Sequence, residues 1–339
     1  MGKIIVGPYH SGLSIPDPAQ LLLPQRFANG RFRSQLVRGG HVVWDSGFHK
    51  QVMTNAFFEA YLGGPSSRSQ LLAYAAVGTG TAEATAGDTT ITQHGPRAPA
   101  QDLESSASIT GNVITQRIQY RWAQGAITTP ITEAALFAAS SGGLTMVRSR
   151  LKDPGGVSTS IPVTAFDALY LTWEVDSIVN LTPLNTTAVY DGVTYDVVAK
   201  PSYWTFDATN NPTSCNNRFA AFSASNQVAQ FLGFSTARAH AIQTLGDVTS
   251  GPSGAAYNVS SVAFQGSYVA GSKQRTVGYS WEGSNTVNAI GRIGSVRVTS
   301  AGAGGGDWQL SFAAQGTGLG IPKNETQRFR LDLTFSYGT

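Results

Sequence analysis

Three residues of the stretch 41–50 belong to the types that bind metals or transfer protons. His41 and His49 flank Asp45 in the sequence. Two imidazoles and a carboxylate in one segment would suit a metal ion or a shared proton, but solvent-exposed or turn-capping roles fit this spacing better. The remaining histidines lie far apart in the chain, at His10, His94 and His240. The histidines therefore predict no metal site.

Glu133 is the carboxylate with the strongest claim to a special role, because it interrupts the apolar stretch Ile131–Phe137. Burying a carboxylate without a partner is costly or raises its pKa. We therefore expect a paired, structural carboxylate, with Arg117 or Arg121 as its partner, rather than a catalytic one.

Other chemical motifs are incomplete. Gly78-Thr79-Gly80-Thr81 lacks the Gly-Lys-Ser/Thr of a phosphate-binding loop. Ser, His and Asp occur without a Gly-x-Ser-x-Gly turn, and no pair of carboxylates marks a glycoside hydrolase. Cys215 is the single cysteine, which excludes an intramolecular disulfide. The sequence predicts no enzyme, no cofactor, and no catalytic, cofactor-binding or metal-binding residues.

The composition favours a neutral, hydroxyl-rich surface. Charged residues make up 13% of the 339 residues and the net charge is +3, whereas ordinary soluble domains carry about 25% charged residues. No basic cluster with interleaved aromatics indicates a specific nucleic-acid partner. We see no secretory signal at the start of the sequence and no apolar run long enough to span a membrane.

Most of the chain predicts β-strands. Ile118, Tyr120 and Trp122 alternate with polar residues, which is the period-2 pattern of a half-buried strand. Asp191-Gly192 between two strand-like runs predicts a hairpin. One short helix is expected near residues 52–62, capped by Thr54 or Asn55. Residues 82–108 are expected to form a long polar loop.

Parts of this pattern occur twice, about 160 residues apart, which predicts a repeated structural unit. Gln116-Arg117, Tyr120 and Trp122 match Gln274-Arg275, Tyr279 and Trp281. Further matches pair Ile131 with Ile290, Ile161 with Ile321, and Leu171-Thr172-Trp173 with Leu333-Thr334-Phe335. Chance similarity between strands is the alternative explanation.

The predicted fold is all-β, with two antiparallel β-sandwich-like modules from an internal duplication. We expect an extended N-terminal arm over residues 1–40, a first module over 41–185, a hairpin and linker over 186–217, and a second module over 218–339. The prolines of the arm favour extended chain over helix. We expect it to lie against another chain through these assembly-contact candidates: Leu21, Leu22, Leu23, Arg26, Arg31 and Arg33.

Four phrases in order carry a family resemblance. They are Trp44-Asp45-Ser46-Gly47-Phe48-His49-Lys50, Thr54-Asn55, Val77-Gly78-Thr79-Gly80-Thr81 and Ile131-Thr132-Glu133-Ala134-Ala135-Leu136-Phe137. Over residues 42–178 the chain resembles structural and tail-associated virion proteins of tailed bacteriophages. Gln51 and Phe57 depart from the residues usual in that pattern. The resemblance implies a virion component made of β-sandwich modules, with no catalytic residues to carry over.

The sequence thus predicts a structural protein of a phage virion, in a tail, collar or fibre attachment, assembled in the host cytoplasm. Its expected partners are other virion proteins, such as tail, portal or fibre subunits, and further copies of itself. The alternative is a receptor- or glycan-binding module of a tail fibre, which would bind a host surface glycan through exposed aromatics such as Trp204 or Trp308. Neither a specific nucleic acid nor a membrane is an expected partner.

Overall fold

A computed structural model describes most of the chain. The described residues are 5–8, 23–63, 71–110, 113–179, 182–202, 236–241, 243–246, 252, 256–281, 291–299, 307–323 and 329–336. They divide into two compact units. Of the described residues, those within 27–178 form the first unit, and those within 179–338 form the second unit together with Ile5–Pro8 and residues 23–26.

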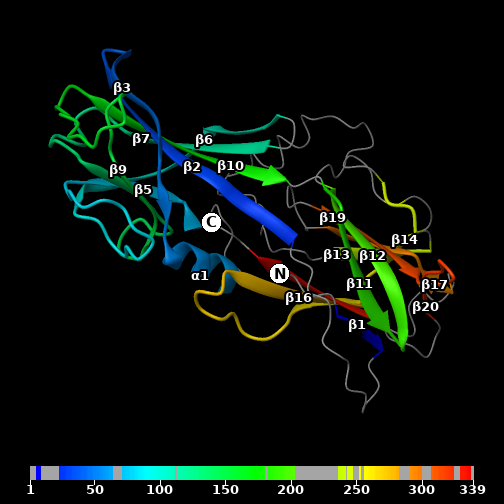
Figure 1. Cartoon of the computed structure of the whole chain (residues 1–339). Helices are drawn as coiled ribbons and strands as arrows, with labels where there is room; N and C mark the ends of the chain where they lie inside the picture. Colours follow the sequence, from blue (N-terminus) through cyan, green and yellow to red (C-terminus); the bar gives the residue numbers. More distant parts are fainter. Residues whose placement is uncertain are drawn as a thin grey trace. The chain divides into compact units, whose positions relative to one another are not determined.

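The first unit is built from strands and one helix. Its elements are β2 (Leu23–Arg38), which begins in the second unit, β3 (His41–Lys50), β4 (Val52–Met53), α1 (Asn55–Gly63), β5 (Tyr74–Gly78), β6 (Gln93–Thr110), β7 (Val113–Trp122), β8 (Glu133–Phe137), β9 (Thr145–Arg150) and β10 (Ala168–Val179). One sheet has the order β3-β2-β10-β7-β6, and the other has the order β6-β5-β8-β9-β4. Strand β6 belongs to both sheets, with a register shift after Gln101. Figure 1 shows β2, β10, β7 and β6 side by side.

The regular elements in the described part of the second unit are all strands. Its elements are β1 (Ile5–Pro8), β11 (Leu184–Tyr190), β12 (Val193–Ser202), β13 (Thr236–His240), β14 (Ala256–Asn258), β15 (Ser261–Phe264), β16 (Gln274–Trp281), β17 (Arg292–Ile293), β18 (Ser295–Thr299), β19 (Asp307–Ala314), β20 (Ile321–Pro322) and β21 (Phe329–Ser336). One sheet has the order β11-β12-β19-β18-β13-β14, and the other joins β15, β16 and β21. Phe329 of β21 contacts Phe312 of β19 and Tyr190 of β11, with ring centroids 6.3 Å apart in each case. These contacts place the core between the two sheets.

These observations confirm the all-β class and its antiparallel sheets. Ile118, Tyr120 and Trp122 are buried on β7, as their alternation predicts. The helix also lies where the sequence placed it: the amide of Phe57 donates to Oγ1 of Thr54, which caps α1. The Asp191-Gly192 hairpin is present as well, and positive φ angles of 49° and 74° at these residues suit its two-residue turn.

Strand registers in the two units correspond at several positions, as the predicted duplication requires. Trp122 pairs with Leu169 and Tyr120 with Leu171 in the first unit, as Trp281 pairs with Phe329 and Tyr279 with Leu331 in the second. The strand pairs β5–β8 and β13–β18 also correspond, because Gly78 faces Glu133 as His240 faces Ser295. Even single backbone hydrogen bonds recur: Thr132 N donates to Gly78 O, and Gly294 N donates to His240 O, both at 2.8 Å.

Four details of the predicted repeat change. The counterpart of Arg117, five residues before Trp122, is Thr276 and not Arg275, so the predicted Gln-Arg match is off by one residue. Ile131 bridges to Ile161 as Ile293 pairs with Ile321, so Ile293 is the counterpart of Ile131. The predicted counterpart, Ile290, lies outside the described residues. On the last strand the counterpart of Leu171 is Leu331 and that of Trp173 is Leu333, two residues earlier than predicted.

The predicted arm does not extend to residue 40. Residues 31–38 pair with β3 and bury Phe32 and Leu36, each 3% exposed, so this stretch is part of the first unit. Strand β1 pairs with β21 of the same chain, from Ile5 opposite Asp332 to Pro8 opposite Phe329. The hairpin expected within residues 186–217 is the β11–β12 pair, which belongs to the second unit's sheet. The rest of the predicted linker, residues 203–217, lies outside the described residues. Residues 31–38 join the first unit because apolar residues alternate with polar ones in this stretch, which gives the strand an apolar face to bury.

Candidate functional site

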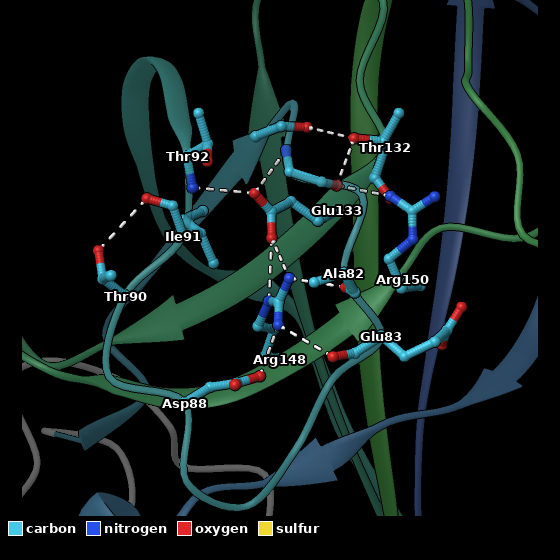
Figure 2. A network of polar contacts seen from close by, with 12 residues as sticks. Ala82, Glu83, Asp88, Thr90, Ile91, Thr92, Thr132, Glu133, Arg148 and Arg150 are labelled. Atoms are coloured by element: carbon cyan, nitrogen blue, oxygen red, sulfur yellow. Dashed lines mark hydrogen bonds and ion pairs between the residues drawn. The ribbon is translucent and has the colours of Figure 1, made fainter.

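Glu133 lies at the centre of a closed polar network on the first unit's second sheet (Figure 2). Its side chain is 0% exposed. Oε1 accepts hydrogen bonds from the backbone amides of Gly80, at 2.8 Å, and Thr92, at 2.9 Å. Oε2 accepts from Nε of Arg148 at 2.9 Å. Both carboxylate oxygens are thus satisfied by protein donors, one of them a guanidinium group.

Arg148 fastens the loop that follows β5. It pairs with Asp88 at 2.6 Å and donates to the carbonyl oxygens of Ala82 at 2.8 Å and Glu83 at 3.3 Å. Burial acts to lower the pKa of Arg148, but the hydrogen bonds to Asp88 and Glu133 outweigh it and raise that pKa. The cation therefore stays charged and joins residues 82–88 to the sheet.

Arg150, two residues after Arg148 on the same face of β9, completes the network. Its Nη1 donates to Gly80 O at 2.6 Å and to Thr132 O at 2.8 Å. Oγ1 of Thr132 also donates to Gly80 O at 2.7 Å. The two sequence phrases Val77–Thr81 and Ile131–Phe137 are thus held together by both backbone pairing and side chains.

Gly78 and Gly80 are glycines because a larger side chain would not fit at either position. A Cβ on Gly78 would lie 2.5 Å from Thr92 O and 2.7 Å from Oε1 of Glu133. A Cβ on Gly80 would lie 2.8 Å from Cδ of Glu133. The loop backbone and the carboxylate leave no room for a methyl group at either position. Gly-Thr-Gly-Thr is therefore a close-approach motif and not a phosphate cradle.

The expected partners of Glu133 were wrong. Arg117 pairs with Glu174 at 2.6 Å, and Nε of Arg121 donates to Oε1 of Gln119 at 2.9 Å. Both arginines project from β7, whereas Glu133 lies on β8. Sequence reasoning missed Arg148 and Asp88. Two arginines inside the otherwise buried run of β9 were the available signal.

His41, Asp45 and His49 do not form a metal site. His41 is opposite Arg38 and His49 is opposite Phe32, at different ends of the β2–β3 pairing. Asp45 instead pairs with Arg33 and accepts from Gly47 N at 2.9 Å. Within the described residues no group of three or more His, Cys, Asp and Glu side chains is placed to hold a metal ion.

Ser46 and Thr54 of the same motif also have structural partners. Oγ of Ser46 accepts from Ser34 N at 2.8 Å beside a register shift between β2 and β3. Oγ1 of Thr54 donates to Thr145 O at 2.6 Å while it caps α1. The hydroxyl groups of Ser46 and Thr54 thus each join two segments of the first unit.

The assembly-contact candidates fall into two groups. Leu21 and Leu22 lie outside the described residues, and Leu23 and Arg26 lie on β2, where the structure describes the backbone alone. Arg31 pairs with Glu174 at 2.7 Å, and Arg33 pairs with Asp45. Both guanidinium groups also lie near the ring of Phe48. Intrachain partners therefore account for these two arginines.

Acid titration should separate the paired carboxylates from ordinary ones. Hydrogen bonds from Arg38 hold the pKa of Asp167 at about 2, against an ordinary value of 3.8. Because the folded value is the lower one, this pair stabilises the fold above pH 3.8 and loses its contribution as the pH falls towards 2. We expect an NMR midpoint near 2 for Asp167, shifted towards 3.8 by Arg38→Gln. A wild-type midpoint near 3.8 would mean that the pair does not form.

In the described part of the chain, no helix has the length and apolar character needed to cross a bilayer.

Comparison with known proteins gives no relative from which to transfer a role: no family model, no curated protein and no solved structure matches this chain.

Proposed function

We propose that this protein is a structural component of a tailed-bacteriophage virion, in a tail, collar or fibre attachment, and acts through protein–protein contacts. The observation that carries the proposal is the convergence in the fold of the motifs that resemble those of such virion proteins. Val77–Thr81 and Ile131–Phe137 form one interlocked framework around Glu133, and Thr54 and Ser46 join further segments. In this framework the motif residues shape a rigid module instead of serving a substrate.

The chemistry of Glu133 supports a non-enzymatic role. A general acid or base must reach the proton that it transfers, yet this carboxylate is 0% exposed and both of its oxygens accept hydrogen bonds. The tandem repeat also supports assembly, because two similar modules in one chain present two related surfaces, and repeated weak contacts add up through multivalency.

The glycan-binding alternative finds little support in the aromatics chosen for it. Trp308 is 5% exposed on β19, and Trp204 lies outside the described residues. Phe166 is the better candidate for stacking on a sugar ring, since it is 68% exposed in the loop before β10. A Phe166→Ala variant that loses binding to a bacterial glycan would favour this alternative.

Two measurements on the purified full-length chain test the proposal. We expect no turnover of bacterial polysaccharides or peptidoglycan, and we expect oligomers in mass photometry that grow with concentration. Turnover that disappears in Glu133→Gln would identify an enzyme and overturn the proposal. A strictly monomeric chain at all concentrations would also count against it.

A further inference from the structure

The described part of the second unit has a counterpart of the Glu133 network in which no carboxylate takes the place of Glu133. His240 faces Ser295 where Gly78 faces Glu133. Across the next strand pair, Gln309 faces Arg297 where Arg148 faces Ala135. A Gly–Glu pair in one repeat thus corresponds to a His–Ser pair in the other. The larger side chain is on β8 in the first unit and on β13, the counterpart of β5, in the second.

His240 and Ser295 are buried without hydrogen-bond partners. Their exposed fractions are 4% and 0%. Among the described residues, neither ring nitrogen of His240 has a hydrogen-bond partner, and neither does Oγ of Ser295. In the first unit Glu133 is paired with Arg148, whereas an imidazolium here would have no acceptor among the described residues. Burial of an unpaired charge is strongly unfavourable, so the closed site requires a neutral ring.

The groups that face His240 offer no compensation. Arg238 lies two residues before His240 on β13, on the same face of the sheet, and Arg297 lies opposite Arg238 on β18. On β14 the residues opposite are Ala256 and Asn258, and the same face of β19 carries Gln309 and Ser311. The described segment 243–246 has no titratable side chain. A protonated His240 would therefore meet two like charges and no carboxylate among the described residues.

Neutral hydrogen bonds hold the segment 243–246 against this sheet. Gly246 N donates to Oε1 of Gln309 at 2.8 Å. Nε2 of Gln243 donates to Phe312 O at 2.7 Å and to Gly318 O at 2.6 Å. This segment follows His240 in the chain, as residues 82–83 follow Gly78 in the first unit. Gln309 thus anchors it as Arg148 anchors the first unit's loop, but without charge.

We propose that His240 is a proton-operated latch, whose protonation releases the segment 243–246 in the second unit while the first unit stays closed. Burial, reinforced by Arg297 and Arg238, lowers the pKa of His240 below its ordinary value of 6.5. An opened site binds the proton near that ordinary value, so falling pH favours the open state. Between pH 7.5 and 5.5 one such proton shifts the equilibrium by up to about tenfold, the limit reached when the closed state binds no proton.

Hydrogen–deuterium exchange of the full-length chain at pH 7.5 and 5.5 tests the latch. After correction for the intrinsic pH dependence of exchange, peptides covering residues 236–246 should exchange faster at pH 5.5, by more than about twofold and up to about tenfold. The equivalent first-unit peptides, covering residues 74–83, should change less than about twofold. Equal responses of the two segments, or no response of 236–246, would overturn the proposal.

His240→Asn should abolish the response of residues 236–246, because an amide does not titrate. His41→Asn is the matched control, since His41 is exposed at the β2–β3 turn and should leave the response intact. If His240→Asn fails to fold, NMR titration of the wild-type imidazole still decides. A folded-state pKa below 6.5 supports the latch, and a value at or above 6.5 overturns it.

Discussion

Arg148→Gln is expected to destabilise the first unit by about 3–5 kcal/mol, the range found when one partner of a buried ion pair is removed. Arg148 is 6% exposed and the only side chain that donates to Oε2 of Glu133 in the described network. Its loss leaves a buried carboxylate short of a cation and frees Asp88 and the loop behind β5. The measurement is the free energy of unfolding of the first unit, followed by hydrogen exchange at residues 74–92.

The double variant Glu133→Gln with Arg148→Gln is the matched control. It removes both charges at once, and the amide oxygen of glutamine can still accept from Gly80 and Thr92. We expect it to recover most of the stability, because the second unit folds with Ser295 and Gln309 at the corresponding positions. A double variant as unstable as the sum of its single changes would show that the two charges act independently.

Gly80→Ala should destabilise the same unit by about 3 kcal/mol, a size typical of overpacking in a rigid site. The new methyl group would lie 2.8 Å from Cδ of Glu133. The carboxylate cannot retreat, since it is held by Gly80 N, Thr92 N and Arg148. Thermal or denaturant unfolding monitored on the first unit would measure the loss.

Gly87→Ala is the control for this change within the same loop. The nearest atom to its added methyl group would be Oγ1 of Thr85 at 3.9 Å, an ordinary contact. We expect a change of less than about 0.5 kcal/mol, as for most surface substitutions. If Gly80→Ala were equally harmless, close approach to Glu133 would not explain the glycine.

Local patterns in the sequence predicted the elements that depend on local physics. Alternation identified the strand ending at Trp122, the Asp-Gly turn identified the hairpin at residue 191, and Thr54 identified the start of the helix. The duplication was visible because equivalent strand positions need similar side chains. These features depend on neighbouring residues or on repetition.

Strand register decides what the sequence could not show. The partner of Glu133 is Arg148 on the adjacent strand, where Ala135 faces Arg148. Arg117 was equally plausible from sequence, because the choice depends on which strands are neighbours. A list of residue types cannot determine that order.

Two segments form strands where the sequence led us to expect a loop and an extended arm. Residues 93–110 form β6 although a loop over 82–108 was expected, since a strand shared by two sheets can be rich in Ala and Ser and still pair on both sides. In the supposed arm, Arg31-Phe32-Arg33 already alternates. Phe32 is buried, and the two arginines pair with carboxylates. Prolines excluded a helix there but did not exclude a strand.

Electron cryomicroscopy of purified particles made by the genome that encodes this chain tests the central claim most directly. If the protein is a virion component, the map should contain several symmetry-related copies of its tandem β-sandwich units in contact with other virion subunits. Complete absence of the chain from such particles, in the map and in their mass-spectrometric composition, would contradict the proposed role.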